Sequence, residues 1–347
     1  MQPYNGGNDP QRGGVYSTGH GFYNPYAEPE WKREKKRIRA AGNGIGLASV
    51  GYVAISFGAV LFLYAAIGVV NALRGGNFME VGENAQWVVM LITYILSLIV
   101  PFGIYALCIQ MPIGAAFPFR KMRGDITVGG IFVGLGAGIV ASYATSYLEQ
   151  ALGLFGIGIS MPDFEIPTAL SAKIIYIITM TVAPAFIEEM VFRGIVMQSL
   201  RRFGDMFALV SSALIFGIFH LNLIQTPYAF ILGLCIGYFV MRTGSLWVGV
   251  IMHFLNNSIA TVLTLAEPYC SEEMFLFINL AYSLAAVMCG IIALCLLLVK
   301  YRDMFRFGDA PGVLSSGKRA AYFLTSPALI IAMLTAVVLT AQYIEIL

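Results

Sequence analysis

The chain has 347 residues, of which 58% are hydrophobic and only 12% are charged, and its formal net charge is +2. Several apolar runs approach or exceed the roughly 20 residues that a membrane-spanning helix needs, so the composition predicts a multi-pass membrane protein. The charge is small and the basic residues lie beside apolar runs, which argues against nucleic acid as a partner.

The first part of the chain differs in composition from the rest. Residues 1–31 are rich in Gly, Asn, Pro and Tyr and hold almost no aliphatic residues, so they cannot bury enough apolar surface to offset the entropy of ordering. The basic run from Lys32 to Arg39 follows, directly before the first apolar segment, as is typical of a cytoplasmic topology signal. We therefore predict a disordered cytoplasmic tail with a basic juxtamembrane run, residues 1–42, and a single transmembrane helical domain, residues 43–347.

Apolar runs bounded by Gly, Pro and charged residues predict nine spans, with eight as the alternative. They lie near residues 45–73, 86–110, 126–150, 170–199, 206–223, 227–242, 245–266, 272–300 and 321–345. The expected fold is all-α, a polytopic helical bundle in the cell membrane. Basic loops alternate with acidic or neutral ones, which places the N-terminus in the cytoplasm and, for nine spans, the C-terminus outside.

Small residues recur every four positions in two of these spans. Gly130, Gly134 and Gly138 lie in the third span, and Gly233 and Gly237 lie in the sixth. Small residues at this spacing let helix backbones approach closely, so we predict helix contacts at both places.

Three charged residues interrupt the fourth predicted span, namely Glu188, Glu189 and Arg193. A central Asp, Lys or Arg costs about 2.5–3.5 kcal/mol on insertion scales, so a charged cluster at this depth indicates a functional site. Glu189 and Arg193 are four residues apart and share a helix face, which predicts a supporting ion pair, whereas Glu188 is rotated about 100° away toward another neighbour. Pro184 removes one helical hydrogen bond nearby and allows a kink that opens a polar pocket.

Two of the three histidines also lie in predicted spans, each with a second residue one turn away on the same face. These pairs are Phe216 with His220 and His253 with Asn257. A single histidine on an apolar face is more often an ordinary core residue. Because every buried polar group needs a partner in hydrocarbon, mutual contact of these groups with Glu188 is the simplest arrangement.

Glu188 and His220 are predicted to lie at different depths in the membrane, which limits how their side chains can meet. Glu188 lies about 25 Å from the outer end of its span at 1.5 Å per residue, whereas His220 is near the outer end of its own. The two side chains meet only if the fifth and sixth spans form a short hairpin that turns within the protein at residues 222–227. Both spans are short, as such a hairpin requires.

A carboxylate, two imidazoles and an amide in one cavity suit the hydrolysis of a peptide bond by water. In this interpretation Glu188 is the general base and shares the attacking water with His220. His253 and Asn257 stabilise the oxyanion of the tetrahedral intermediate. No cofactor is then required.

Three alternatives stay open. Glu188, His220 and His253 also form a zinc ligand set of two imidazoles and a carboxylate, although the usual His-Glu-x-x-His helix is absent. A proton-coupled transporter would use the same charges as a relay, although the chain has no inverted repeat. A non-catalytic immunity or scaffold protein would keep these residues for helix packing alone, although packing would tolerate Gln in place of Glu188.

At these residues the chain resembles the CPBP family of intramembrane proteases, also called Abi or CAAX-prenyl-endopeptidase-like proteins. Three motifs carry the resemblance: Glu188-Glu189-x-x-x-Arg193, Phe216-x-x-x-His220 and His253-x-x-x-Asn257. The resemblance covers roughly residues 170–262 and implies a catalytic core of four or five helices there. It also implies glutamate-type proteolysis in the bilayer, with the first Glu and the second-motif His activating water and the last His and Asn forming the oxyanion hole. The implied substrate is a membrane protein or peptide, lipidated or not.

Overall fold

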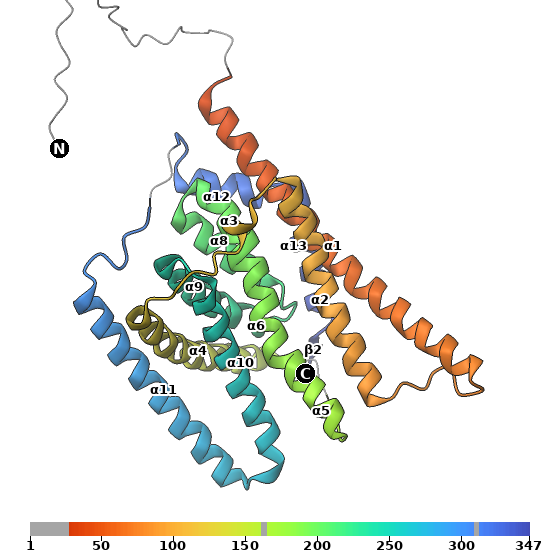
Figure 1. The fold of residues 1–347 in the computed structure, drawn as a ribbon. Helices are drawn as coiled ribbons and strands as arrows, with labels where there is room; N and C mark the ends of the chain where they lie inside the picture. Colours follow the sequence, from red (N-terminus) through yellow and green to blue (C-terminus); the bar gives the residue numbers. More distant parts are fainter. Residues whose placement is uncertain (1–27, 161–164, 309–311) are drawn as a thin grey trace, which may run out of the picture.

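The computed structural model describes residues 28–160, 165–308 and 312–347, so most of the predicted disordered tail lies outside the described residues. The described chain is helical except for two short strands and the connecting loops (Figure 1). In chain order its elements are α1 (Glu30–Leu73), α2 (Glu83–Cys108), α3 (Ile113–Ala116), α4 (Gly124–Gly153), β1 (Ile157–Ile159), α5 (Leu170–Ile177), η1 (Ile178–Val182), α6 (Ala183–Glu188), η2 (Glu189–Val196), α7 (Met197–Leu200), η3 (Arg201–Phe203), α8 (Asp205–Ile218), α9 (Gln225–Thr243), α10 (Leu246–Ala266), η4 (Glu267–Tyr269), α11 (Glu272–Lys300), α12 (Ser316–Leu324), α13 (Pro327–Ala341) and β2 (Ile344–Ile346).

Among the described residues, seven helices are long and apolar enough to cross a membrane, and the bent pair α12–α13 makes eight if it counts as one span. The predicted polytopic all-α fold is therefore confirmed. The α8 helix has only 14 residues and falls among the shorter apolar helices, so the nine predicted spans correspond to seven or eight full ones.

The first helix begins earlier than the sequence indicates. Residues 30–42, which we assigned to the disordered tail, are the first turns of α1, and Ile38 within them is fully buried. The side chains of Lys35 and Arg39 lie over the ring of Tyr322 on α12, with 4.8 and 5.9 Å to its centroid. The basic run of residues 32–39 therefore packs against α12, a contact that composition alone does not predict.

The fourth predicted span is a single rod of changing helical type, from α5 through η1, α6 and η2 to α7. The segments η1 and η2 are π-helical, and Pro184 lies near the start of α6 between them. Proline has no backbone N–H, so the carbonyl of Met180, four residues earlier, lacks an α-helical partner. The interruption that Pro184 predicts is present, and it takes the form of π-helical turns, which often mark functional sites.

The short helices α8 and α9 pack against each other as a hairpin. Asn222 in the turn is fully buried, and its Oδ1 accepts hydrogen bonds from the N–H groups of Ile224 and Gln225. Its Nδ2 donates to the carbonyl of Ser160 at 3.3 Å. The turn thus lies within the protein, as contact between His220 and Glu188 requires.

The glycine stripe on α4 is a packing face against α9 and α10. A Cβ atom at Gly130 would meet the ring of Phe239, and one at Gly134 would meet the end of Met252. The predicted close packing of this span is therefore confirmed.

The last predicted span, residues 321–345, is not one helix. It divides into α12 and α13, which are bent by 68° at Thr325 and Ser326. Ser326 is extended (ψ 129°) because the residue before a proline, here Pro327, is disfavoured in the helical region. The end of the predicted span is the strand β2, which pairs antiparallel with β1 so that Ile346 lies opposite Ile157.

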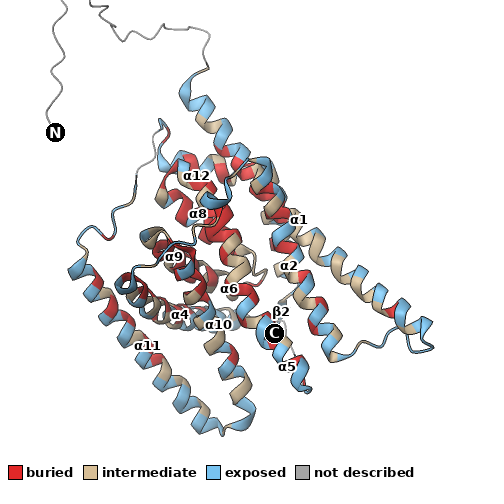
Figure 2. Cartoon of the chain, viewed as in Figure 1, coloured by how far each residue is buried: buried red, intermediate tan, exposed pale blue. Residues whose placement is uncertain are grey.

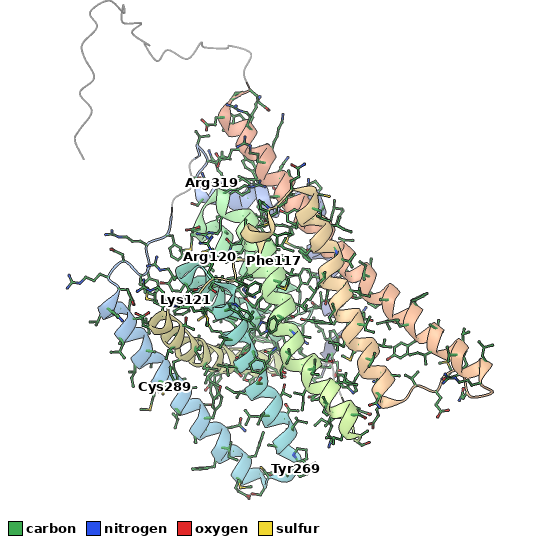
Figure 3. All side chains as sticks on the ribbon, in the orientation of Figure 1. Phe117, Arg120, Lys121, Tyr269, Cys289 and Arg319 are labelled. Carbon is green, nitrogen blue, oxygen red and sulfur yellow. The ribbon has the colours of Figure 1, made fainter. Side chains whose placement is uncertain are left out.

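The core lies where α6 to α10 meet, and buried residues concentrate there in Figure 2. The second half of α1 and most of α11 carry exposed apolar side chains, among them Leu61, Leu284 and Leu296. Exposed leucines over whole helices are typical of surfaces that face lipid. Figure 3 places Arg120 and Arg319 toward the end of the molecule at which α1 begins and Tyr269 at the opposite end.

Candidate active site

A buried ion pair stands at the centre of the site. Arg193 Nη1 donates to Glu189 Oε1 at 2.7 Å, and the two side chains are 1% and 0% exposed. The guanidinium also lies over the ring of Phe216 on α8, 4.2 Å from its centroid. The intrahelical pair expected from the four-residue spacing is present, and it is tied to a second helix.

Glu189 also holds one of the histidines. His253 Nδ1 lies 3.0 Å from the same Oε1 that binds Arg193. Two glycines leave room for this cluster: a Cβ at Gly249 would come within 2.7 Å of Glu189 Oε2, and one at Gly233 within 3.2 Å of Arg193 Nη2. The four-residue spacing predicts only the pair of Glu189 with Arg193, and it gives no sign of this contact with His253 on α10.

Phe216 joins all three motifs. Its ring meets the imidazole of His220 edge to face at 5.0 Å and that of His253 at 5.9 Å, in addition to its contact with Arg193. A single aromatic side chain thus fixes the spacing between α8, α10 and η2.

Glu188 faces another helix, as its rotation from Glu189 predicts. Its Oε1 accepts a hydrogen bond from the hydroxyl of Tyr94 on α2 at 2.6 Å. Its Oε2 lies 3.8 Å from His253 Nε2 and has no hydrogen-bond partner among the described residues. The side chain as a whole is 15% exposed, whereas Oε2 itself is enclosed by protein.

Tyr94 could not be predicted from the sequence as a partner of Glu188. A hydroxyl in an apolar span needs a partner, which is a signal, but the chain has 18 tyrosines and no spacing distinguishes this one. Tyr94 lies on α2, far in sequence from the three motifs, so only the fold reveals its contact with Glu188.

His220 lies directly after α8 with its Nδ1 2.9 Å from the carbonyl of Phe216. A carbonyl only accepts hydrogen bonds, so Nδ1 carries the proton, and in the neutral ring Nε2 keeps a free lone pair. The imidazole of His220 meets the ring of Phe216, which also contacts His253 and Arg193. Phe216 therefore links His220 to the buried polar cluster.

Asn257 lies one turn after His253 on α10. Its Nδ2 donates to the carbonyl of Met180 at 3.3 Å, the carbonyl that Pro184 deprives of its α-helical partner. The side chain is half-buried beside the π-helical segment η1. Glu188 and His253 thus lie 3.8 Å apart, Asn257 follows one turn further along α10, and His220 is linked to His253 through the ring of Phe216.

Glu188, His220 and His253 are the zinc ligands of the alternative interpretation. Among residues 28–160, 165–308 and 312–347, no three His, Cys, Asp or Glu side chains are grouped so as to hold a metal ion. His253 Nδ1 lies against the carboxylate of Glu189, and zinc-bound histidines commonly place their second nitrogen in the same way. The zinc alternative is therefore tested by chelation.

Residues 170–259 match the family model of type II CAAX prenyl endopeptidases, Rce1-like. The resemblance to the CAAX protease-like family is thereby confirmed. The Rce1-like segment runs from α5 into α10 and contains all three motifs, whereas α1, α2, α4 and the last three helices lie outside it. The curated proteins and the solved structures give no significant match.

Proposed function

We propose that this protein is an intramembrane endopeptidase that hydrolyses a peptide bond with water activated by Glu188 and His220. One observation carries the proposal: in the described part of the chain Glu188 Oε2 has no hydrogen-bond partner, and it lies 3.8 Å from His253 Nε2. That separation is too long for a direct hydrogen bond, so Oε2 keeps its lone pairs for the proton of an attacking water. The Rce1-like match of the surrounding helices supports the same chemistry.

In the proposed mechanism the water donates one hydrogen bond to Glu188 Oε2 and lies near the lone pair of His220 Nε2. Tyr94 holds the other carboxylate oxygen, so Oε2 alone is free to accept the proton. The carboxylate takes this proton as the water oxygen attacks the carbonyl carbon, and the proton then passes to the leaving amine. Glu188 and His220 thus activate the water together.

The oxyanion of the intermediate would be stabilised by His253 Nε2–H and an N–H of Asn257. For Nε2 to donate while Nδ1 bonds to Glu189, the ring of His253 must carry both protons. Two carboxylates would then face two cations, His253 and Arg193, and the buried cluster would be neutral. Donors of this kind typically change kcat by about 100- to 1000-fold.

The substrate that we infer is a membrane-associated protein with a CAAX-type, prenylated C-terminus. The Rce1-like match supports this substrate class. The site is built by helices whose outer surfaces are apolar, so a lipid-anchored peptide would arrive from the bilayer.

The test is cleavage by purified protein in detergent of a library that contains farnesylated and unmodified CAAX peptides, read by mass spectrometry. The wild type should cleave, and Glu188→Gln and His220→Ala should abolish cleavage. Glu149→Gln, at an exposed position of α4, is the matched control and should remain active. Cleavage that persists in both site variants would exclude the proposed base, and no cleavage by the wild type would favour a non-catalytic protein.

A chelation experiment distinguishes the zinc alternative. Activity should survive exhaustive treatment with a chelator, because the proposed mechanism uses protein groups and water only. Loss of cleavage that added zinc restores would support Glu188, His220 and His253 as metal ligands instead.

A further inference from the structure

A series of side-chain hydrogen bonds runs from α9 through α10 to η1, beside the candidate site. The hydroxyl of Tyr228 lies 2.9 Å from Asn256 Oδ1, and Asn256 Nδ2 lies 3.3 Å from Asn257 Oδ1. Asn257 Nδ2 in turn lies 3.3 Å from the carbonyl of Met180. The three side chains are half-buried, in a region where polar groups must find partners.

The carbonyl of Met180 determines which atoms donate and which accept along these hydrogen bonds. Pro184 has no N–H, so the carbonyl of Met180 needs another donor, and a carbonyl only accepts. Asn257 must therefore turn its Nδ2 toward Met180 and its Oδ1 toward Asn256. By the same reasoning Asn256 presents Nδ2 to that oxygen, and the Tyr228 hydroxyl donates to Asn256 Oδ1.

In this orientation one N–H of the Asn257 side-chain amide has no partner in the network. Its amide has two N–H bonds, of which one goes to Met180, and its oxygen is taken by Asn256. We propose that Tyr228 and Asn256 are positioning residues that aim the second N–H of Asn257 at the substrate oxyanion, an inference that rests on the proposed function. With the amide reversed, Asn257 would present an oxygen to the oxyanion, and the interaction would be repulsive.

A third helix lies close to this network. A Cβ atom at Gly138 on α4 would stand 3.0 Å from Asn256 Oδ1 and 3.6 Å from the hydroxyl of Tyr228. Gly138→Ala is thus a mild way to disturb the network without removing any of its groups. Gly134→Ala, one turn earlier on the same face, would meet only the flexible end of Met252 and is the matched control.

The first experiment uses the peptide that the wild type cleaves fastest. Asn256→Ala should lower kcat roughly tenfold or more and change KM by less than about twofold, because the lost interaction forms only in the transition state. Gly138→Ala should lower kcat in the same way, whereas Gly134→Ala should keep the wild-type value. Tyr228→Phe should add nothing to Asn256→Ala, because Tyr228 acts only through Asn256. Additive losses, or an unchanged kcat in Asn256→Ala, would overturn the proposal.

Thermal unfolding in detergent gives a second test that needs no activity. Asn256→Ala and Asn257→Ala should destabilise the protein less together than the sum of their separate effects, since they break the same hydrogen bond. Asn257→Ala combined with Asn279→Ala should be additive, because Asn279 bonds to the carbonyl of Phe275 in its own helix. Additivity in the first pair would overturn the network. Coupling in that pair without any wild-type cleavage would refute the proposed function alone.

Discussion

Glu189 illustrates how a buried charge can be held by several partners at the scale of single residues. Its Oε1 meets both Arg193 and His253, and a glycine on α10 makes room for its Oε2. A charge of this kind is stable only while its partners remain, because solvation by water is not available to it. The pair therefore serves the fold as well as the orientation of His253.

We expect Arg193→Ala to destabilise the protein strongly, by roughly 3–5 kcal/mol, because it leaves Glu189 buried without its cation. Arg201→Ala is the matched control, since Arg201 makes a 2.7 Å ion pair with Asp205 at a four-residue spacing but is 38% exposed. Such exposed pairs contribute less than about 1 kcal/mol. Unfolding of both variants in detergent, followed by tryptophan fluorescence, measures the difference, and equal losses would contradict this account.

Tyr94→Phe should lower kcat roughly tenfold or more and leave KM nearly unchanged, because a hydrogen bond to a charged group is lost at the general base. Tyr105→Phe lies on the same helix and loses a contact of 3.2 Å with Ser199 away from Glu188, so it should keep the wild-type kcat. Steady-state cleavage of one peptide by the three proteins is the measurement. A similar kcat in all three would remove Tyr94 from the site.

The motif residues could be predicted from the sequence because charge and imidazole are rare in apolar spans and one-turn spacing assigns them to faces. Glu188, His220 and His253 are recognisable on that basis. The contact of Glu188 with Tyr94 and that of Glu189 with His253 could not be predicted. Both depend on how separate helices are rotated about their axes, which no spacing within one helix specifies.

At the scale of elements, α1 and the α12–α13 bend depend on each other. The face of α1 around Gly42 and Gly46 lies against the bend, and a Cβ atom at Gly46 would collide with the backbone of Ala328 and Leu329. A backbone cannot move aside as a side-chain end can. The small residues of α1 therefore position the last two helices.

Gly46→Ala should consequently destabilise the protein by about 1–3 kcal/mol, the usual range for overpacking. Gly58→Ala in the same helix meets nothing within 4 Å and should be neutral or stabilising by up to about 1 kcal/mol, since alanine favours the helix. Thermal unfolding of the two variants provides the comparison. Destabilisation of the same size by Gly58→Ala would contradict the explanation by packing at Gly46.

Most elements were predictable because long apolar runs correspond directly to helices, and Pro184 signals a break in the fourth span. A proline, Pro327, also marks the bend between α12 and α13. The apolar run continues across this proline, however, so hydropathy alone predicts one span there. Strand β2 was not predictable, because its residues pair with β1 some 190 positions earlier in the chain. The added turns at the start of α1 depend on contacts with α12, which are equally non-local.

At the scale of the whole molecule, the charges of the loops predict the orientation in the membrane. Arg120 and Lys121 in the loop before α4, and Arg319 on α12, lie away from Tyr269 in Figure 3. Under the positive-inside rule the loop between α10 and α11 is outside and the start of α12 is cytoplasmic. This orientation is a prediction to be tested in cells.

A membrane-impermeant maleimide should label Cys270 in intact cells when it is the sole cysteine, because this residue lies in the loop between α10 and α11. A cysteine-free protein with Ser315→Cys should react only after permeabilisation, since the exposed Ser315 directly precedes α12. The opposite pattern of labelling would reverse the predicted topology.

The pairing of β2 with β1 has a practical consequence for handling the protein. The N–H of Leu347 donates to the carbonyl of Gly156 at 2.9 Å, and the side chain of Leu347 lies against Gly158. An affinity tag or fluorescent fusion joined directly after Leu347 would disturb the pairing of β2 with β1 and, through it, the loop that follows α4. Purification handles and reporters are therefore better attached ahead of α1, or behind a flexible spacer.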